Sequence, residues 1–424
     1  DGQWVRFQRG LPRKIGGYRS INRYLTEISR GFTSFTQQSL QYCHSGGPGT
    51  LERFTIDASK NSSIISSRTP VSVYATGTVT LLTGGAGSVD TVTVNGVTIT
   101  SGSVGFTTDL ATTATAVAAN ITAFTSSPNY TAVAVGTTIT ITATTASASV
   151  DGFVVAATLT TITASTTNMT GGSAPLVSSP YNIWMFQYMY SSSSTDNSII
   201  AHVAPNGQCV CNDTGGQIFI GDVLTTTPLT EILLPSGVNV TGGIVSLHPY
   251  LFYYGTAGIV GWSVAGDPTD LSGSGIARVW GQKIIKGMPL RAGSGSAPAG
   301  LFWAYDAVIR ATFTGGATVF QFDIIATDTS IMSADSVVDY DGVFFWAGVD
   351  RFLMFNGVVR DVPNQLNINW FFDNLNESQR AKVFAWKMPL FGEIWWAYPR
   401  DDATECTHAI VYNVRENTWY DTAL

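Results

Sequence analysis

The sequence predicts an all-β protein: a β-propeller of about six blades with a small α+β module inserted into it. Three observations indicate this fold class. Short aromatic strands bounded by Gly, Asn and Asp turns recur along residues 175–424, at a spacing of about eight to twelve residues. Glycine is abundant, at 43 residues, as tight turns between short strands require. Residues 76–174 interrupt the pattern with a Thr-, Ala- and Val-rich stretch that contains no Lys or Arg.

Residues 1–75 are expected to form the N-terminal strands and the first blade. Aromatic strand-like stretches alternate there with Gly turns. A helix over residues 20–30 is also considered, although its apolar spacing is poor. In the strand that follows, alternation predicts that Phe54 and Ile56 face inward, and that four residues face outward: Leu51, Arg53, Thr55 and Asp57.

Residues 76–174 are predicted to fold as a separate β-β-α-β-β module. Low complexity permits disorder, but the strict alternation in TVTVNGVTIT and TTITITAT favours strands. Asp109 is a plausible N-cap for a helix over residues 109–124, which has an Ala-rich body. The expected strands cover residues 77–82, 91–100, 130–135, 137–144 and 152–160.

Residues 175–424 are predicted to form the remaining blades. A unit of an apolar strand, a Gly turn and a second aromatic strand recurs within roughly 40 residues, as in propeller arrays. Radial repetition also protects strand edges. We expect the N-terminal strand to complete the last blade, and a helical stretch over residues 374–386. The six blades are assigned to residues 31–75, 176–226, 229–272, 275–327, 331–372 and 380–424.

The charge distribution argues against a protein that grips DNA along its whole surface. Charged residues make up 12% of the chain, about half the share of an ordinary soluble domain. Residues 1–68 carry ten bases and four acids, whereas residues 69–277 carry no base and nine acids. Because Lys and Arg supply most of the non-specific affinity for phosphate, the middle half of the chain is unsuited to binding DNA. A wall past which DNA slides should likewise lack positive charge.

No catalytic, cofactor-binding or metal-binding residue is predicted. Asp401, Asp402 and Glu405 lie close enough to suggest acid–base hydrolysis of sugars, but a polar hairpin tip explains them better. The DYDG segment at residues 339–342 lacks the later ligands of a calcium loop and is expected to form a β-turn. Cys209 and Cys211 have no second Cys/His pair at zinc spacing. Nucleophile-elbow and phosphate-loop motifs are absent.

Aromatic residues are predicted to pack the blades, with a carbohydrate-stacking platform as the alternative. The residues concerned are Trp184, Trp262, Trp303, Trp346, Trp395, Trp396 and Trp419. No apolar run approaches the ~18 residues that a membrane-spanning helix needs.

Several segments, in order, resemble tail proteins of short-tailed bacteriophages of the tubular tail protein B or packaged-DNA-stabilisation kind. They are WVRFQRGLPRKIGGYR (4–19), SIIAHVAPNG (198–207), GIVGWSVAGDPTDL (258–271), SIMSADSVVDYDGVFFWAGVDRFLMFNGVVRDVPN (330–364) and ATECTHAIVYNVRENTWYDTAL (403–424). The resemblance covers most of the chain outside residues 76–174, a stretch that instead is similar to small αβ modules of phage virion proteins.

The resemblance implies a structural virion protein, not an enzyme, and no cofactor. It implies a propeller in the tail nozzle or hub, assembled in the host cytoplasm as a homohexamer that retains and conducts DNA during packaging and ejection. The implied partners are adaptor or portal-proximal tail proteins, tail fibres or spikes, and DNA bound without sequence specificity. The alternative is a tail protein that binds or depolymerises host surface carbohydrate.

Basic residues outside residues 69–277, the stretch without Lys or Arg, are predicted to contact acids of another subunit or of a neighbouring ring. DNA binding by the N-terminal arm is the alternative. The predicted contact residues are Arg6, Arg9, Arg13, Lys14, Arg19, Arg278, Lys283, Lys286 and Arg291.

Overall fold

A computed structural model gives the architecture of most of the chain. It describes residues 5–15, 20–21, 23–37, 39–190, 197–208, 215–271, 275–290, 297–316, 318–363 and 368–424.

Six four-stranded antiparallel sheets form the main body, and each consists of four strands that follow one another along the chain. The first sheet contains β3 (Gly31–Gln37), β4 (Leu40–Gly46), β5 (Leu51–Ile56) and β6 (Ser66–Ser67). The second contains β15 (Ile183–Tyr190), β16 (Asn197–Gln208), β17 (Gln217–Asp222) and β18 (Thr230–Ile232). The third contains β19 (Gly243–Leu247), β20 (Tyr250–Tyr254), β21 (Ile259–Trp262) and β22 (Ile276–Arg278).

The remaining three sheets repeat the same order. The fourth contains β23 (Ile284–Pro289), β24 (Ala299–Ala304), β25 (Ala307–Phe313) and β26 (Phe320–Thr327). The fifth contains β27 (Val338–Tyr340), β28 (Val343–Ala347), β29 (Phe352–Phe355) and β30 (Val359–Asp361). The sixth contains β31 (Phe384–Met388), β32 (Glu393–Tyr398), β33 (His408–Asn413) and β34 (Thr418–Ala423).

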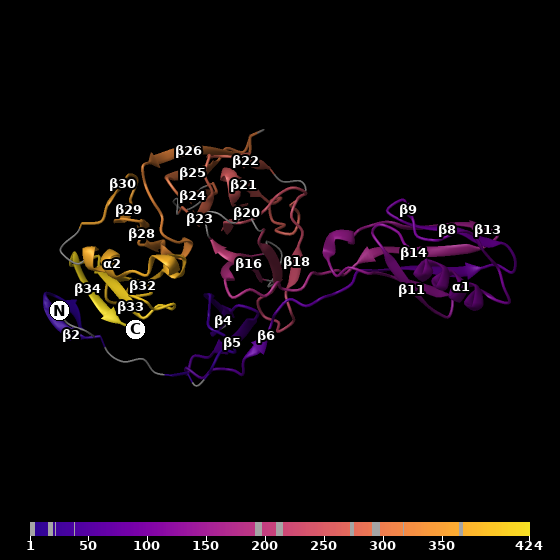
Figure 1. Cartoon of the computed structure of the whole chain (residues 1–424), viewed down its shortest axis with the longest axis horizontal. Coiled ribbons are helices and arrows are strands. Elements are labelled where there is room, and N and C mark those ends of the chain that lie inside the picture. Colours follow the sequence, from indigo (N-terminus) through magenta and orange to yellow (C-terminus); the bar gives the residue numbers. More distant parts are fainter. Residues whose placement is uncertain are drawn as a thin grey trace.

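The six sheets follow one another around a ring (Figure 1). First strands of neighbouring sheets contact one another at the inner side, for example β3 with β15, β15 with β19, and β19 with β23. The prediction of six groups of strands is therefore confirmed. Two predicted boundaries were wrong: β18 was assigned to the third blade but belongs to the second sheet, and β22 was assigned to the fourth blade but belongs to the third sheet.

Apolar clusters fill the spaces between consecutive sheets. Leu51 and Trp184 pack together between the first and second sheets, and Phe252 and Phe302 do so between the third and fourth. Phe352 and Trp396 lie 4.8 Å apart, centroid to centroid, between the fifth and sixth. Burial of each such side chain contributes about 1.5–3 kcal/mol to the free energy of folding, and this stabilises the packing of neighbouring sheets against each other.

The junction between the sixth and first sheets, called the seam here, is built differently. Among the described residues, no buried apolar cluster joins these two sheets. The face of the sixth sheet that carries Trp395 and Val411 packs instead against Ile15, which follows an N-terminal hairpin. The seam is thus the one junction between successive sheets that lacks a shared apolar cluster in the described chain.

The N-terminal hairpin consists of β1 (Val5–Gln8) and β2 (Leu11–Lys14). Among the described residues these two strands pair only with each other, so the expectation that an N-terminal strand completes the last blade was wrong. Arg9 and Gly10 adopt positive φ angles of 56° and 70° and form a tight turn that closes the hairpin on itself. The hairpin is fastened to the sixth sheet by side chains rather than by a shared strand ladder.

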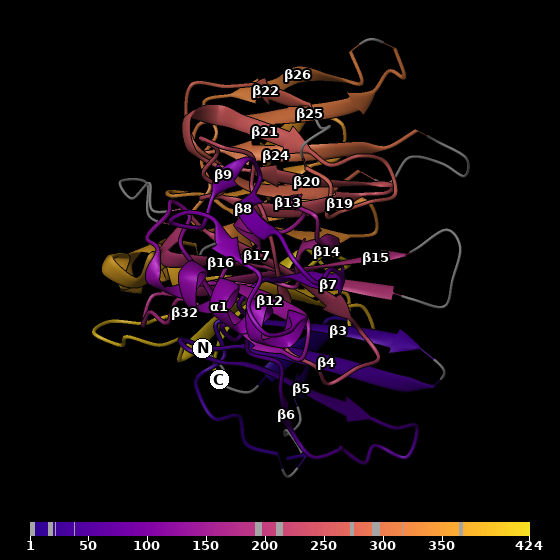
Figure 2. The ribbon, with the colours of Figure 1, turned by 90° about the vertical axis from the view of Figure 1, so that its right-hand side faces the viewer.

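The inserted module extends outward from the ring, and Figure 2 shows it from its free end. One sheet has the order β11-β12-β7-β14, and the other has β10-β8-β13 with β9 at the side. The elements are β7 (Thr76–Thr83), β8 (Ser88–Val94), β9 (Val97–Thr98), β10 (Val104–Gly105), α1 (Leu110–Ala123), β11 (Tyr130–Val135), β12 (Thr138–Ala143), η1 (Ala148–Val150), β13 (Val155–Thr160) and β14 (Thr163–Thr170).

The module has its own core, whose buried members all lie between Ala75 and Met169. The predicted helix is confirmed, and the Asp109 carboxylate accepts a hydrogen bond from the Thr112 amide at 2.7 Å, as an N-cap does. The strand over residues 130–135 is also confirmed, whereas β14 had not been predicted. β14 pairs with β7 and completes the larger sheet.

The helix considered over residues 20–30 is absent from the described residues of that segment, which have no regular secondary structure apart from bends. Their polar groups are used in contacts with the first sheet. The Glu27 carboxylate accepts from the Gly49 amide at 2.7 Å, and the Thr26 amide donates to Glu52 at 3.0 Å. These tertiary contacts replace the hydrogen bonds that a helix would form.

The helical stretch predicted over residues 374–386 was also displaced. α2 (Ile368–Asn374) ends where that helix was expected to begin, and a 3-10 helix, η4 (Glu377–Lys382), leads into β31. The alternation predicted around Phe54 fails because Leu51 and Arg53 are both buried. Sheets of the ring are covered on both faces, so inward and outward residues do not alternate cleanly.

Candidate functional site

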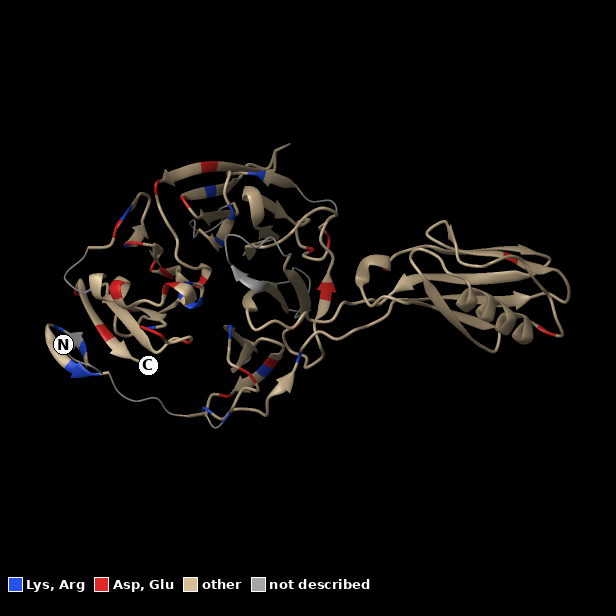
Figure 3. Cartoon of the chain, in the orientation of Figure 1, with Lys and Arg blue, Asp and Glu red and all other residues tan. Residues whose placement is uncertain are grey.

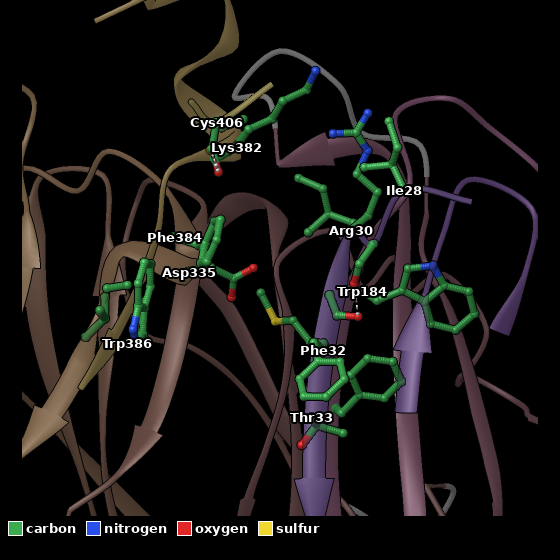
Figure 4. Close-up of a pocket in the computed structure, with 18 of the residues that line it drawn as sticks. Ile28, Arg30, Phe32, Thr33, Trp184, Asp335, Lys382, Phe384, Trp386 and Cys406 are labelled. Atoms are coloured by element: carbon green, nitrogen blue, oxygen red, sulfur yellow. Dashed lines mark hydrogen bonds between the residues drawn. The ribbon is translucent and has the colours of Figure 1, made fainter. Parts of the chain in front are cut away.

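A cavity lies on the inner side of the seam, where the first strands of four sheets, β3, β15, β23 and β31, contribute to its lining; Figure 4 shows the residues around it. Its volume is about 800 Å³, within the range of small-ligand sites. The walls come from the segment that enters β3, from β15, from Lys286 of β23, from the region of Asp335, and from β31. Residues far apart in the sequence thus meet in this seam pocket.

A charged tie crosses the seam beside the pocket. The Arg30 guanidinium donates to both carboxylate oxygens of Glu405, at 2.7 and 2.9 Å. Lys382 contacts the same carboxylate at 3.1 Å and donates to the Thr404 carbonyl at 2.5 Å. Burial works to raise the pKa of Glu405, but the bonds from Arg30 and Lys382 outweigh it and lower that pKa. The carboxylate therefore stays ionised and links the first sheet to the last.

A second ion pair lies deeper in the pocket. The Lys286 ammonium donates to the Asp335 carboxylate at 3.2 Å, and the side chains are 18% and 33% exposed. Both acids that line the pocket are therefore engaged by cations. General acid catalysis by a carboxyl group needs a raised pKa, which the pairing of Glu405 opposes. The neighbouring Cys406 thiol is also a poor nucleophile, because burial and Glu405 raise its pKa to about 12.

Aromatic side chains form two walls of the pocket. Phe384 and Trp386 of β31 stack at a centroid distance of 5.4 Å, and Phe32 of β3 lies on the other side (Figure 4). Phe32 is 56% exposed and Phe384 is 42% exposed. Such rings offer flat apolar faces that stack on sugars or planar groups.

The three acids singled out for sugar hydrolysis do not form a catalytic pair. They lie in the hairpin loop between β32 and β33, as predicted, and Asp401 occupies a positive φ of 54°. Arg400 contacts Asp401 at 3.4 Å. Glu405 alone of the three lines the seam pocket.

The predicted contact residues are dispersed. Arg6 is buried and bonds within the chain: its Nη2 donates to Glu393 at 3.2 Å, and the guanidinium lies 3.3 Å from the Phe391 ring centroid. It is therefore unavailable to a neighbouring subunit. Arg9, Arg13 and Lys14 are exposed on the hairpin.

The remaining predicted bases have different surroundings. Arg278 is exposed at the end of β22, Lys283 is buried, and Lys286 lines the seam pocket. Arg19 and Arg291 lie outside the described residues. Contacts of any of these residues with another subunit stay a prediction.

Other motifs have structural roles. The seven tryptophans are buried, with at most 8% exposure, as predicted for blade packing. The DYDG segment ends β27 and turns into β28 at Asp341 and Gly342, with the Gly342 amide donating to Asp339 at 2.9 Å. Cys209 and Cys211 lie outside the described residues. In the described part of the chain, no cluster of three or more His, Cys, Asp or Glu residues is arranged to hold a metal.

None of the helices in the described ranges has the length and hydrophobicity to span a bilayer.

Comparison with known proteins places the chain in no family: no family model matches it, and neither does any curated protein. Several solved structures show a distant likeness. The nidogen/laminin complex has 9% identity over 59% of this chain and 84% of that one, with a TM-score of 0.35. A putative exported protein of Bacteroides fragilis has 6% identity over 59% and 78%, with a TM-score of 0.29. The NanB sialidase of Streptococcus pneumoniae has 10% identity over 81% and 68%, with a TM-score of 0.28. Likeness at this level carries no functional argument.

Sequence reasoning missed the seam pocket because its parts are hundreds of residues apart. Arg30 and Glu405 are separated by 375 positions, and no local spacing relates them. The one signal available in the sequence was a pair of aromatics two positions apart in the first strand of a blade, Phe384 and Trp386, which share one face of β31.

Proposed function

We propose that the chain is a structural subunit of the tail nozzle of a short-tailed phage, in which several copies surround the DNA path. We further propose that its six sheets act as a closed propeller and that it has no enzymatic activity. The resemblance of five segments to such tail proteins motivates the proposal. Those segments fall on the hairpin and on the second, third, fifth and sixth sheets, so they span the ring rather than one site.

The observation that carries the proposal is that two separate sets of contacts join the first and the sixth sheets, which are the two ends of the ring. The hairpin is locked to the sixth sheet by Arg6 and Glu393, and the chain continues from it to the first sheet. Arg30 and Glu405 join the same two sheets at the pocket. A ring whose ends are tied twice resists opening under load, as a subunit beside moving DNA must. Neither carboxylate of the pocket is left unpaired for chemistry.

The dimensions of the seam pocket favour a DNA path between copies rather than through the ring axis. A cavity of about 800 Å³ with side-chain walls accommodates a small ligand, not a duplex. A conduit would then be lined by the outer surfaces of several rings, with few bases facing the phosphates.

The alternative function, carbohydrate binding, is favoured by the exposed rings of Phe32 and Phe384. Glycan depolymerisation is less favoured, because Asp335 and Glu405 are both held in ion pairs.

The two functions are separated by assaying the purified chain on capsular and O-antigen polysaccharides alongside duplex DNA. We expect no turnover, and little DNA affinity at physiological salt. Turnover that is lost in Glu405→Gln or Asp335→Asn, but kept in Asp402→Asn, would establish a glycan-degrading site instead. Tight DNA binding that falls steeply with salt and is lost in Arg9→Ala/Arg13→Ala would indicate a DNA-gripping role.

A further inference from the structure

The two ends of the molecule carry opposite charge. The hairpin, residues 5–14, contains Arg6, Arg9, Arg13 and Lys14 and no acid. The module, residues 76–174, contains three Asp residues and no Lys or Arg. Figure 3 shows the hairpin without red segments and the module without blue ones, at opposite ends of the long axis. Within one chain these two surfaces are therefore too far apart to meet.

The hairpin presents a surface that has no cover in the described chain. All four residues of β2 are exposed, and Leu11 is 59% exposed beside Arg13 and Lys14. Arg6 is neutralised by Glu393, so the exposed charge comes from Arg9, Arg13 and Lys14. The hairpin is already fastened to the sixth sheet by Arg6 and by Glu416, which accepts from the Gly10 amide at 3.1 Å, so a partner would add contacts through β2.

The module presents a complementary surface along β11. Within the described residues this strand pairs only with β12, and on its other side the Thr122 hydroxyl of α1 accepts from the Ala132 amide at 2.9 Å and donates to the Ala132 carbonyl at 3.1 Å. What β11 offers a partner is therefore its exposed face, because its sequence, YTAVAV, carries no charge. Val133 is 67% exposed and Val135 is 77% exposed, on the same face of the strand.

An acidic residue lies at the N-terminus of the helix that packs on β11. α1 packs on β11, and Asp109 caps the N-terminus of α1. The Asp109 carboxylate is fully exposed, and the backbone hydrogen bond from Thr112 lowers its pKa, so it is ionised at neutral pH. The module thus combines an apolar strip on β11 with a negative charge at the N-terminus of the helix that packs on this strand.

We propose that the exposed face of β11, with Val133 and Val135, and Asp109 of the same module dock on the N-terminal hairpin of a second copy of this chain. Leu11 packs on the two valines, and Arg13 and Lys14 face Asp109. Because the two surfaces lie at opposite ends of the molecule, each copy contacts two others. Such a head-to-tail contact gives a closed ring of copies or an open filament. The proposal rests on the assembly of copies that the proposed function requires.

The test is sedimentation velocity of the full chain over a concentration series, at low and physiological salt. We expect the wild type to assemble, with weaker association at higher salt. Arg13→Glu/Lys14→Glu should weaken association at least tenfold, and Val135→Asp should have a similar effect. The matched controls Lys60→Glu/Arg360→Glu and Val154→Asp make the same changes at exposed sites elsewhere and should leave association unchanged.

A charge exchange makes the test specific. Asp109→Lys should weaken association, and its combination with Arg13→Glu/Lys14→Glu should restore association to within about threefold of wild type. Circular dichroism of each variant verifies that the loss of the N-cap has not unfolded the module. Packing of two β11 faces against each other would instead make association sensitive to Val135→Asp and insensitive to the hairpin variants, and would overturn the proposal.

Two further outcomes separate this contact from the function proposed above. A hexamer that persists in every variant would overturn the docking contact and leave the nozzle function standing. A wild type that stays monomeric at all concentrations would overturn both.

Discussion

Arg6 and Glu393 form a buried ion pair between the hairpin and the sixth sheet. Glu393 is fully buried and also accepts from the Trp395 indole at 3.1 Å. Removing one partner of a buried pair leaves a charge without compensation, which is more costly than removing both. These two residues are therefore the most sensitive points of the hairpin attachment.

Arg6→Met should lower the free energy of unfolding by about 3–5 kcal/mol, because the Glu393 carboxylate loses its cation. The double variant Arg6→Met/Glu393→Gln should lose less free energy of unfolding than the two single variants lose together. Urea denaturation measures both effects. Equal and additive losses would show that the pair contributes nothing as a pair.

Two buried histidines predict a dependence of stability on pH. Burial lowers the pKa of His202 to about 4, and burial together with Arg68 and Arg53 lowers that of His44 to about 3. In the unfolded chain both titrate near the ordinary value of 6.5. Since the unfolded state then binds more protons, stability is complete above pH 6.5 and falls as the pH drops toward the folded values.

We expect the free energy of unfolding to fall between pH 7.5 and pH 5, by up to about 2 kcal/mol for each histidine. His202→Gln should reduce this slope, because glutamine does not titrate and its amide can donate to the Val240 carbonyl as the imidazole does. Urea denaturation at both pH values is the measurement. A slope unchanged in His202→Gln would assign the dependence to other groups.

At the scale of elements, local signals predicted part of the module, but the strand expected over residues 91–100 is broken by a turn at Asn95 and Gly96 between β8 and β9. Asp109 as an N-cap and the alternation in residues 130–135 are local, and both gave the right element. The helix expected over residues 20–30 failed because Thr26 and Glu27 bond to the first sheet instead. Pairing of β14 with β7 connects residues about 90 positions apart, a relation that periodicity alone does not contain.

One carboxylate fastens the module to the ring. Glu231 of β18 accepts from the Ala148 amide at 3.2 Å and from the Ala174 amide at 3.1 Å, and its own amide donates to Ser173. The module core itself does not include ring residues. The module should therefore fold by itself, with an orientation set by this anchor.

Replacing residues 76–171 by a short Gly/Ser bridge should leave a soluble ring that unfolds cooperatively, because Ser173 and Ala174 keep their contacts with Glu231. Thermal unfolding followed by circular dichroism measures this. Aggregation or loss of cooperativity would show that the module is part of the ring. In the full chain, Glu231→Gln should change the module orientation, measured by small-angle scattering, without lowering ring stability by more than about 1 kcal/mol.

At the scale of the whole molecule, the seam is the one junction of the described ring that is held by polar contacts and by the hairpin instead of a shared apolar cluster. Five junctions share apolar contacts, whereas the sixth depends on the hairpin and on the tie between Arg30 and Glu405. The six-unit count followed from the repeat of strand signals along the sequence. The nature of the seam could not be predicted, because it is made by residues from both ends of the chain.

Glu405→Gln should accelerate hydrogen exchange at the amides of β3 and β31, since it removes the charge that joins the two sheets. The exposed Asp402→Asn, in the same loop, is the matched control and should leave exchange unchanged. Mass spectrometry of the exchanged peptides measures the difference. Equal exchange in both variants would show that the tie does not hold the seam.

The most direct test of the proposed nozzle function is electron cryo-microscopy of the assembled particle that contains this chain. We predict several copies of a closed six-sheet ring around the DNA path, with the module of each copy next to the hairpin of its neighbour. Density for the chain at the tip of a tail spike, away from the DNA path and with glycan in the seam pocket, would contradict the account.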